Sequence, residues 1–264
     1  MKWAEGGVTA LVLAGRRGGD AGADPMAAAA GVSHKALLPV AGVPMLLRVI
    51  SALRGSPAVG CIVVSIEAPE ESLFGLDGLE NVLLRAAAPS PARSAAAALE
   101  EFGAPLLVTT ADHALLTPAM VAHLLSAVPP GVAAAAALAR RETVLAAYPE
   151  ARRTWLRFRD GAFSGCNLFL LAEAEGAARA AAFWRRAEAE RKRPLAMARL
   201  LGLLTLLRFA LGRLTLRAGL DALERRCGAR LHAVEMPFAD AAVDVDKPAD
   251  LALAEAALHR RKAG

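Results

Sequence analysis

The stretch that decides the fold begins with VTALVLAG (residues 8–15), continues as RRGGDAGADPMAAAAGVS (16–33) and ends with HKALLPVAGVPMLL (34–47). Its opening apolar run is typical of a parallel strand that is covered on both faces. Glycines follow at positions 15, 18, 19 and 22, and without Cβ atoms the backbone N–H groups there can converge on an anion. Lys35 would add a compact positive charge for a phosphate. We therefore expect a strand, a glycine-rich phosphate loop, a functional lysine and a helix that begins after Gly42.

The loop matches neither of the two common phosphate-binding motifs. A P-loop needs its lysine between a glycine and a serine or threonine, whereas Lys35 lies between His34 and Ala36. A dinucleotide fingerprint needs Gly-x-Gly-x-x-Gly, and Gly15-Arg-Arg-Gly18 breaks that spacing.

The pattern resembles the signature of the MobA-like NTP transferase superfamily, which includes molybdenum-cofactor guanylyltransferases and sugar-phosphate cytidylyltransferases. Members have a strand that ends in Leu-Ala-Gly, a glycine-rich loop, a lysine, and then Leu-Leu-Pro-x-x-Gly-x-Pro-(Leu/Met)-Leu. Leu13-Ala14-Gly15 and the run KALLPVAGVPML (residues 35–46) match this signature almost position for position. The second block is the more specific one, because Gly and Pro recur at fixed offsets.

Length and composition agree with one large α/β domain over residues 1–264. Hydrophobic residues make up 55% of the chain and aromatic residues only 5%, which suits helices packed on a sheet. The net charge of +5 fits an anionic substrate or membrane surface, but no basic run is interleaved with the aromatics that would stack on nucleic acid. Three scattered cysteines and no long apolar segment predict a cytoplasmic protein with neither disulfides nor a membrane span.

Alternating apolar runs and turn signals predict the remaining elements. We expect strands at 60–66, 81–84, 105–110, 131–138, 154–158, 163–171 and 231–236. Helices are expected at 43–53, at 95–102 with Ser94 as the N-cap, after Thr117-Pro118, and from about residue 251 to the end. The resemblance implies a three-layer sandwich with a mostly parallel, Rossmann-like sheet, as in nucleotide-diphospho-sugar transferases and GT-A enzymes, plus a helical insertion at 176–229.

Asp112 follows the strand at 105–110, so it should share one rim of the sheet with the Gly15 loop. The resemblance makes Asp112 a ligand of Mg²⁺, and makes Arg93 and Ser94 contacts to the nucleotide base. It also suggests Gly165 and Asn167 as contacts to the acceptor. Three of these residues have a purely structural alternative. Asp112 could accept hydrogen bonds from backbone N–H groups, Ser94 could cap a helix, and Asn167 could form a turn.

The segment VDVDKPADL (residues 243–251) strongly resembles the closing motif of the family, Val-Asp-x-Pro-x-Asp-Leu. Asp246 takes the place of its metal-binding aspartate, and Asp244 would support it. Asp250 is better explained by its favourable charge in the first turn of a helix. Asp244-Val245-Asp246 also spells the DxD of glycosyltransferases, but that motif normally follows the mid-chain strand, so we rank this alternative lower.

The stretch 191–220 contains seven Lys or Arg residues, no Asp or Glu, and many leucines. We expect amphipathic helices interrupted near Pro194, Gly202 and Gly212. The favoured interpretation is a helical subdomain that covers the acceptor side of the site. The alternative is a basic, apolar surface that contacts a lipid-linked acceptor or the inner face of an anionic membrane.

The implied activity is Mg²⁺- or Mn²⁺-dependent transfer of a nucleotide from an NTP to a phosphorylated small molecule, with release of pyrophosphate. Asp112 and Asp246 would hold the metal and Lys35 would stabilise charge at the α-phosphate. The nucleotide contacts implied at the loop are Leu13, Ala14, Gly15, Arg16, Arg17, Gly18 and Gly19.

One departure from the family leaves an alternative open. The glycine-rich loop usually carries an arginine where this chain has Asp20, which leaves room for a non-catalytic, nucleotide-binding or regulatory member. We prefer an enzyme because Lys35, Asp112 and Asp246 occur together. The Pro-Ala-Arg-Ser segment (91–94) is closer to cytidylyltransferases than to guanylyltransferases and favours CTP over GTP.

Overall fold

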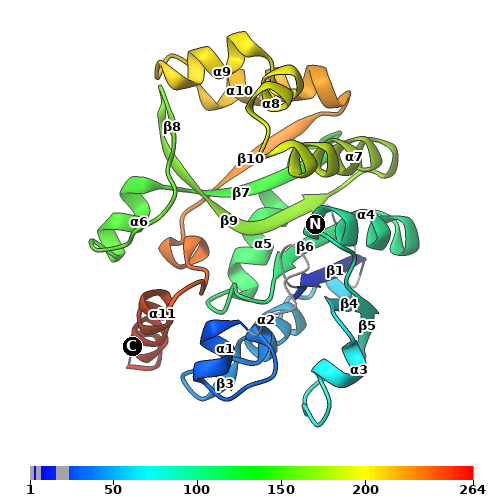
Figure 1. The fold of residues 1–264 in the computed structure, drawn as a ribbon, viewed down its shortest axis with the longest axis vertical. Helices are drawn as coiled ribbons and strands as arrows, with labels where there is room; N and C mark the ends of the chain where they lie inside the picture. Colours follow the sequence, from blue (N-terminus) through cyan, green and yellow to red (C-terminus); the bar gives the residue numbers. More distant parts are fainter. Residues whose placement is uncertain (1–2, 4–6, 16–23, 264) are drawn as a thin grey trace.

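The computed structural model describes residues 3, 7–15 and 24–263 (Figure 1). Its centre is an eight-stranded sheet in the order β10-β7-β9-β6-β1-β4-β5, with β8 paired to β9. β9 is antiparallel to its neighbours and the other pairs along this order are parallel. The strands are β1 (Val8–Leu13), β4 (Val59–Ile66), β5 (Val82–Ala86), β6 (Leu106–Thr110), β7 (Ala134–Arg140), β8 (Leu156–Phe158), β9 (Gly161–Leu171) and β10 (Leu231–Met236), with a separate pair β2 (Pro39–Val40) and β3 (Val43–Pro44).

Helices cover both faces of this sheet, as expected for a three-layer α/β fold (Figure 1). The α-helices are α1 (Pro25–Ala29), α2 (Met45–Arg54), α3 (Pro69–Ser72), α4 (Pro91–Phe102), α5 (Pro118–Ala127), α6 (Arg141–Ala147), α7 (Ala174–Glu190), α8 (Pro194–Leu201), α9 (Leu203–Ala210), α10 (Leu216–Cys227) and α11 (Pro248–Ala263). Short 3-10 helices lie at η1 (Lys35–Leu37) and η2 (Ala239–Ala242).

The packing of the central strand β1 explains why its sequence is apolar except for Thr9. Ala10 and Val12 belong to the core under α2 and α5, whereas Leu11 and Leu13 belong to the core under α4 and α7. Successive side chains of a strand point to opposite faces, and here both faces are buried. The strand therefore has no polar side, as the sequence predicts.

Three predicted boundaries were wrong. Helix α4 begins at Pro91 and is capped by Ser90, so Ser94 lies inside the helix and does not cap it. Helix α2 begins at Met45, because Val43 and Pro44 pair with Pro39 and Val40 as a short hairpin. Strand β7 begins at Ala134 and runs to Arg140, later than predicted.

Three short helices were not predicted. α1 lies inside the segment that we treated as loop, where the Asp24 side chain accepts hydrogen bonds from the backbone N–H groups of Met26 and Ala27. α3 lies in the predicted loop after β4, and α6 directly follows β7.

The region 191–220 forms α8, α9 and the start of α10, with breaks at the predicted residues. Figure 1 shows these helices gathered at one end of the molecule, beyond β8 and β10. The preceding α7 belongs to the sheet's own helical layer, because Ala177 and Ala181 are buried in its core. Within the described residues, every helix is too short or too polar to cross a lipid bilayer.

Candidate functional site

Lys35 is the centre of a cluster of charges from three distant parts of the chain. It opens the helical turn η1, in which the His34 imidazole Nδ1 accepts a hydrogen bond from the backbone N–H of Ala36. The Lys35 ammonium lies 2.7 Å from Asp246 Oδ1 and 3.6 Å from Asp112 Oδ2. Burial lowers the pKa of Lys35, but the two carboxylates outweigh it and the net shift is upward. Lys35 is therefore a fixed positive charge at neutral pH.

Asp112 is positioned by the end of β6 and by the segment after β10. The Thr110 hydroxyl donates to Asp112 Oδ1 at 2.5 Å, while the Asp112 carbonyl accepts from the Val245 N–H at 3.1 Å. Burial raises the pKa of Asp112, the Asp244 and Asp246 carboxylates raise it further, and Lys35 and Thr110 oppose the shift. The Asp112 carboxyl therefore lies in a buried environment, in which its negative charge is costly unless a cation balances it.

Residues 243–246 alternate between buried and more accessible positions. Val243 and Val245 are buried in the core, whereas Asp244 pairs with Arg153 and Asp246 pairs with Lys35. The Asp246 N–H donates to Asp250 Oδ2 at 3.3 Å, which fixes the segment at the start of α11. Asp246 thereby reaches Lys35, and its role as a metal ligand stays a prediction.

Arg153 is a member of the cluster that the sequence analysis missed. Its guanidinium is ion-paired with Asp244, lies 3.7 Å from Asp250 Oδ1, and is only 9% exposed. It occupies an irregular segment between α6 and β8, with no motif around it that points to the site. Arg153 could therefore have been identified only from the packing of that segment against residues 244–250.

Asn167 also joins the cluster, but through Asp244. It adopts a positive φ of 45°, which Asn tolerates better than most residues, at an irregularity in the β7–β9 pairing. Its amide donates to Asp244 Oδ2 at 3.2 Å. Gly165, two residues earlier, is exposed and pairs with Leu138 in the sheet. Asn167 therefore positions a carboxylate, and a contact of either residue with an acceptor stays a prediction.

The phosphate loop is described only at its first residues. Leu13 and Ala14 are buried, and the Ala14 N–H donates to the Ser65 carbonyl at the end of β4. A Cβ on Gly15 would lie 2.9 Å from the Ala87 methyl and 3.2 Å from Glu67 Oε1, so a larger residue would displace the segment that follows β5. The predicted contacts Arg16, Arg17, Gly18 and Gly19, and the unusual Asp20, lie outside the described residues.

Glu67 is a second residue that the sequence analysis did not single out. It follows β4 directly, its Oε2 lies 3.4 Å from His34 Nε2, and its Oε1 faces Gly15. The rule that functional groups gather at the carboxyl ends of parallel strands could have identified it.

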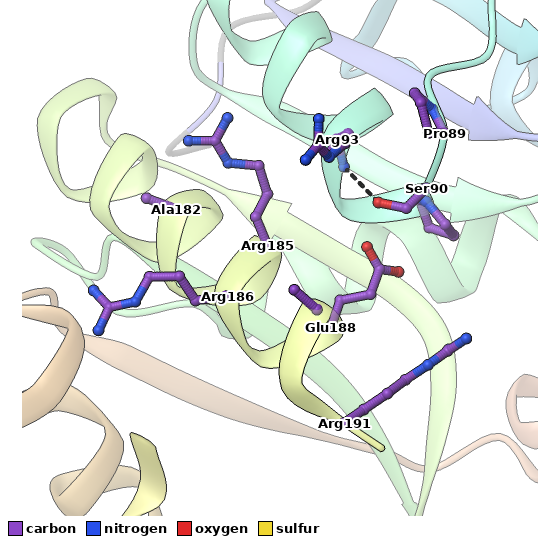
Figure 2. A pocket seen from close by; sticks show the side chains of 10 residues that line it. Pro89, Ser90, Arg93, Ala182, Arg185, Arg186, Glu188 and Arg191 are labelled. Atoms are coloured by element: carbon purple, nitrogen blue, oxygen red, sulfur yellow. Dashed lines mark hydrogen bonds between the residues drawn. The ribbon is translucent and has the colours of Figure 1, made fainter. Parts of the chain in front are cut away.

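Arg93 and Ser94 lie on the neighbouring stretch of the rim. The buried Ser94 hydroxyl accepts a hydrogen bond from the Ala88 N–H at 2.9 Å, and so holds the loop that passes Gly15. Arg93 lines a pocket of about 780 Å³, which lies between the start of α4 and α7 (Figure 2). Arg185, Arg186 and Arg191 also line this pocket. Among the described residues, its lining includes no member of the Lys35 cluster. The structure therefore brings Lys35, Asp112 and Asp246 together, whereas Arg93 lines a different pocket.

The charge balance of the cluster suits a divalent cation. Among the residues that the structure describes, four carboxylates (Asp112, Asp244, Asp246 and Asp250) pair with two cationic side chains, Lys35 and Arg153. Within the described residues, no three His, Cys, Asp or Glu side chains form a metal site by themselves. Mg²⁺, however, is usually held by one or two carboxylates together with substrate phosphates and water. Asp112 and Asp246, already arranged around one positive charge, fit that ligand set.

Comparison with known proteins identifies the family to which most of the chain belongs. The family model of the MobA-like NTP transferase domain matches residues 10–226. A hypothetical transferase from Thermus thermophilus is 32% identical, with a TM-score of 0.76, over 92% of this chain and 98% of its own. No curated protein sequence matches the chain.

Two more distant structures share the fold alone. CMP:2-keto-3-deoxy-manno-octonic acid synthetase, solved in complex with CTP, is 13% identical with a TM-score of 0.58, over 96% of this chain and 99% of its own. 4-Diphosphocytidyl-2C-methyl-D-erythritol synthase is 14% identical with a TM-score of 0.53, over 95% of this chain and 98% of its own.

Proposed function

Because the chain belongs to the MobA-like NTP transferase domain family, a family of nucleotidyltransferases, we propose that it transfers a nucleoside monophosphate from an NTP to a phosphorylated small molecule. Pyrophosphate is the second product. The observation that carries this proposal is the convergence of Lys35, Asp112 and Asp246, from three distant segments, beside the start of the glycine-rich loop.

The side chains act by positioning and electrostatics. The Lys35 ammonium is oriented by Asp112 and Asp246, so it can stabilise the negative charge that develops around the α-phosphate. Backbone N–H groups after Ala14 bind the β- and γ-phosphates, the future pyrophosphate. The acceptor's phosphate oxygen attacks in line and is already ionised at neutral pH, so the chain needs no general base.

The proposal includes Mg²⁺ held by Asp112 and Asp246. When bound, the metal would neutralise charge on the triphosphate and orient it. The chain's own contribution is to hold two carboxylates at one point, through Thr110 for Asp112 and the backbone of Asp246 with Asp250. Mn²⁺ has the same preference for oxygen ligands and should substitute.

The arrangement of Asp244 supports nucleotidyl transfer over a glycosyltransferase that uses Asp244 and Asp246. Asp244 is paired with Arg153 and accepts from Asn167, so of the two aspartates it is Asp246 that reaches Lys35. For the nucleotide, CTP stays the favoured substrate. Support comes from the segment 91–94 at the start of α4 and from the fold shared with a synthetase solved with CTP.

The test is pyrophosphate release with Mg²⁺, each of the four NTPs, and a panel of sugar, polyol and molybdopterin phosphates. Replacing Lys35→Met, Asp112→Asn or Asp246→Asn should reduce the rate by about 100-fold or more. Asp77→Asn, at an exposed position between α3 and β5, is the matched control and should leave the rate unchanged.

Two results would contradict the proposal. Full activity in the Asp112→Asn and Asp246→Asn variants would place the chemistry elsewhere. NTP binding without pyrophosphate release for any acceptor would favour the non-catalytic, regulatory alternative.

A further inference from the structure

An exposed apolar surface lies on α8 and α9, far from the Lys35 cluster in sequence. Leu195 on α8 and Leu203, Leu204, Leu207 and Leu211 on or just after α9 are between 52% and 77% exposed. The four leucines of α9 have the spacing i, i+1, i+4 and i+8, which places them on one side of a helix. We call these five residues the α8–α9 leucine face.

The other side of α9 is anchored to the body of the protein. Phe209 packs edge-on against Phe158 of β8, with ring centroids 5.2 Å apart. The Arg159 N–H, in the β8–β9 turn, donates to the Leu214 carbonyl at 2.8 Å, directly after α9. The helix is therefore fixed in an orientation that presents its leucines outward. Exposed apolar patches on a packed element mark contact sites for proteins or membranes.

Positively charged residues flank the leucine face in the sequence. Residues 191–220 contain seven Lys or Arg and no Asp or Glu. Arg191, Lys192 and Arg193 precede α8, Arg208 lies in the last turn of α9 and Arg213 follows that helix; all five are exposed, and Arg193 is ion-paired with Glu190. A partner that covers this face must therefore offer apolar atoms at its centre and negative charge at its margin.

We propose that the α8–α9 leucine face docks onto a membrane that contains anionic lipids. The leucines enter the boundary between headgroups and acyl chains, and the flanking Arg and Lys side chains reach the phosphates. A second copy of the chain fits less well. A two-fold contact would place the same patch on both sides and bring like charges together, with no acidic residue in 191–220 to balance them.

The experiment is co-sedimentation of the full chain with vesicles of phosphatidylcholine alone and of phosphatidylcholine mixed with phosphatidylglycerol. Binding is expected only to the mixed vesicles. It should weaken strongly in about 1 M salt, where charges are screened beyond about 3 Å. Leu204→Glu with Leu207→Glu should lower the partition coefficient by at least about tenfold. Arg208→Gln with Arg213→Gln should lower it by about fivefold for each charge removed.

Phe74→Glu is the matched control, since Phe74 is 90% exposed next to α3, at the other end of the molecule from α9 (Figure 1). This variant should bind vesicles like the parent, and circular dichroism should show all variants folded. The proposal is overturned if the parent does not bind mixed vesicles. It is also overturned if sedimentation velocity shows a dimer that the two Glu substitutions on α9 dissociate, because a second copy would then cover the face.

Discussion

Single residues at the candidate site form two linked groups of opposite charges. In one, Lys35 lies between Asp112 and Asp246; in the other, Arg153 lies between Asp244 and Asp250. Removing one member of a buried ion pair costs more than the pair contributes, because the remaining charge is left unbalanced. Positioning residues such as Arg153 should therefore show strong energetic coupling to their carboxylates.

The first prediction concerns that coupling. Arg153→Met should lower the free energy of unfolding by about 3 kcal/mol, because it leaves Asp244 and Asp250 without their cation. Adding Asp244→Asn should recover part of the loss, so that the double variant loses less than the sum of the two single variants. Urea unfolding of the four proteins measures the coupling. Strictly additive losses would show that Arg153 does not hold Asp244.

A second prediction concerns His113, next to Asp112. His113 is fully buried, with Nδ1 3.3 Å from the Thr109 hydroxyl and no partner for Nε2 among the described residues. Burial first, and Arg261 second, lower the pKa of His113 from 6.5 to about 4. The unfolded chain therefore binds a proton at a higher pH than the folded chain, and stability falls as pH drops from 6.5 towards 4.

The expected loss from this residue is about 3 kcal/mol over that range. His113→Phe keeps a ring in the site and cannot titrate. The difference in unfolding free energy between parent and variant should therefore change with pH, in the variant's favour at low pH. Parallel pH profiles for the two proteins would contradict the assignment.

At the scale of elements, three helices begin with the same signal, a capping side chain followed by proline. These are Asp24-Pro25 at α1, Ser90-Pro91 at α4 and Thr117-Pro118 at α5. Of these, only the third was predicted. For α4 the predicted helix began at Ala95 with Ser94 as its N-cap, although Ser90 and Pro91 give the stronger signal four residues earlier.

The two serines of α4 should consequently respond differently to substitution. Ser90→Ala removes an N-cap and should cost about 1 kcal/mol of stability, with little change in nucleotide affinity. Ser94→Ala leaves the Ala88 N–H without its acceptor, which should cost about 1–3 kcal/mol and weaken nucleotide binding as the loop beside Gly15 loosens. Denaturation and nucleotide titration of each variant measure both quantities. Equal effects of the two substitutions on affinity would contradict these roles.

The elements most readily predicted are those whose burial produces a recognisable pattern of apolar residues in the local sequence. β1 and β10 were located well because buried strands are continuously apolar or bounded by clear turns. α6 was missed because seven residues are too few to establish a helical period. Likewise, Lys35, Asp112 and Asp246 lie in motifs, whereas Arg153 enters the site only through packing of distant segments.

At the scale of the whole molecule, the sheet order explains why distant residues meet. β1 lies between β6 and β4, so the loops that leave their carboxyl ends share one rim. The segment after β10 reaches the same rim beside Asp112, where the Val245 N–H donates a hydrogen bond to the Asp112 carbonyl. In the described part of the chain, this site has more carboxylates than cationic side chains, and we propose that a metal–nucleotide complex balances them.

Thermal unfolding with CTP, in the presence and absence of Mg²⁺, tests this claim most directly. Ligand at about 100 times its dissociation constant stabilises a protein by about 2.7 kcal/mol, which corresponds to a rise in Tm of roughly 5–10 °C for a chain of this size. We predict that rise for the parent only when Mg²⁺ is present, and its loss in Asp112→Asn and Asp246→Asn. An equal rise in parent and variants, or one that does not depend on Mg²⁺, would contradict the account.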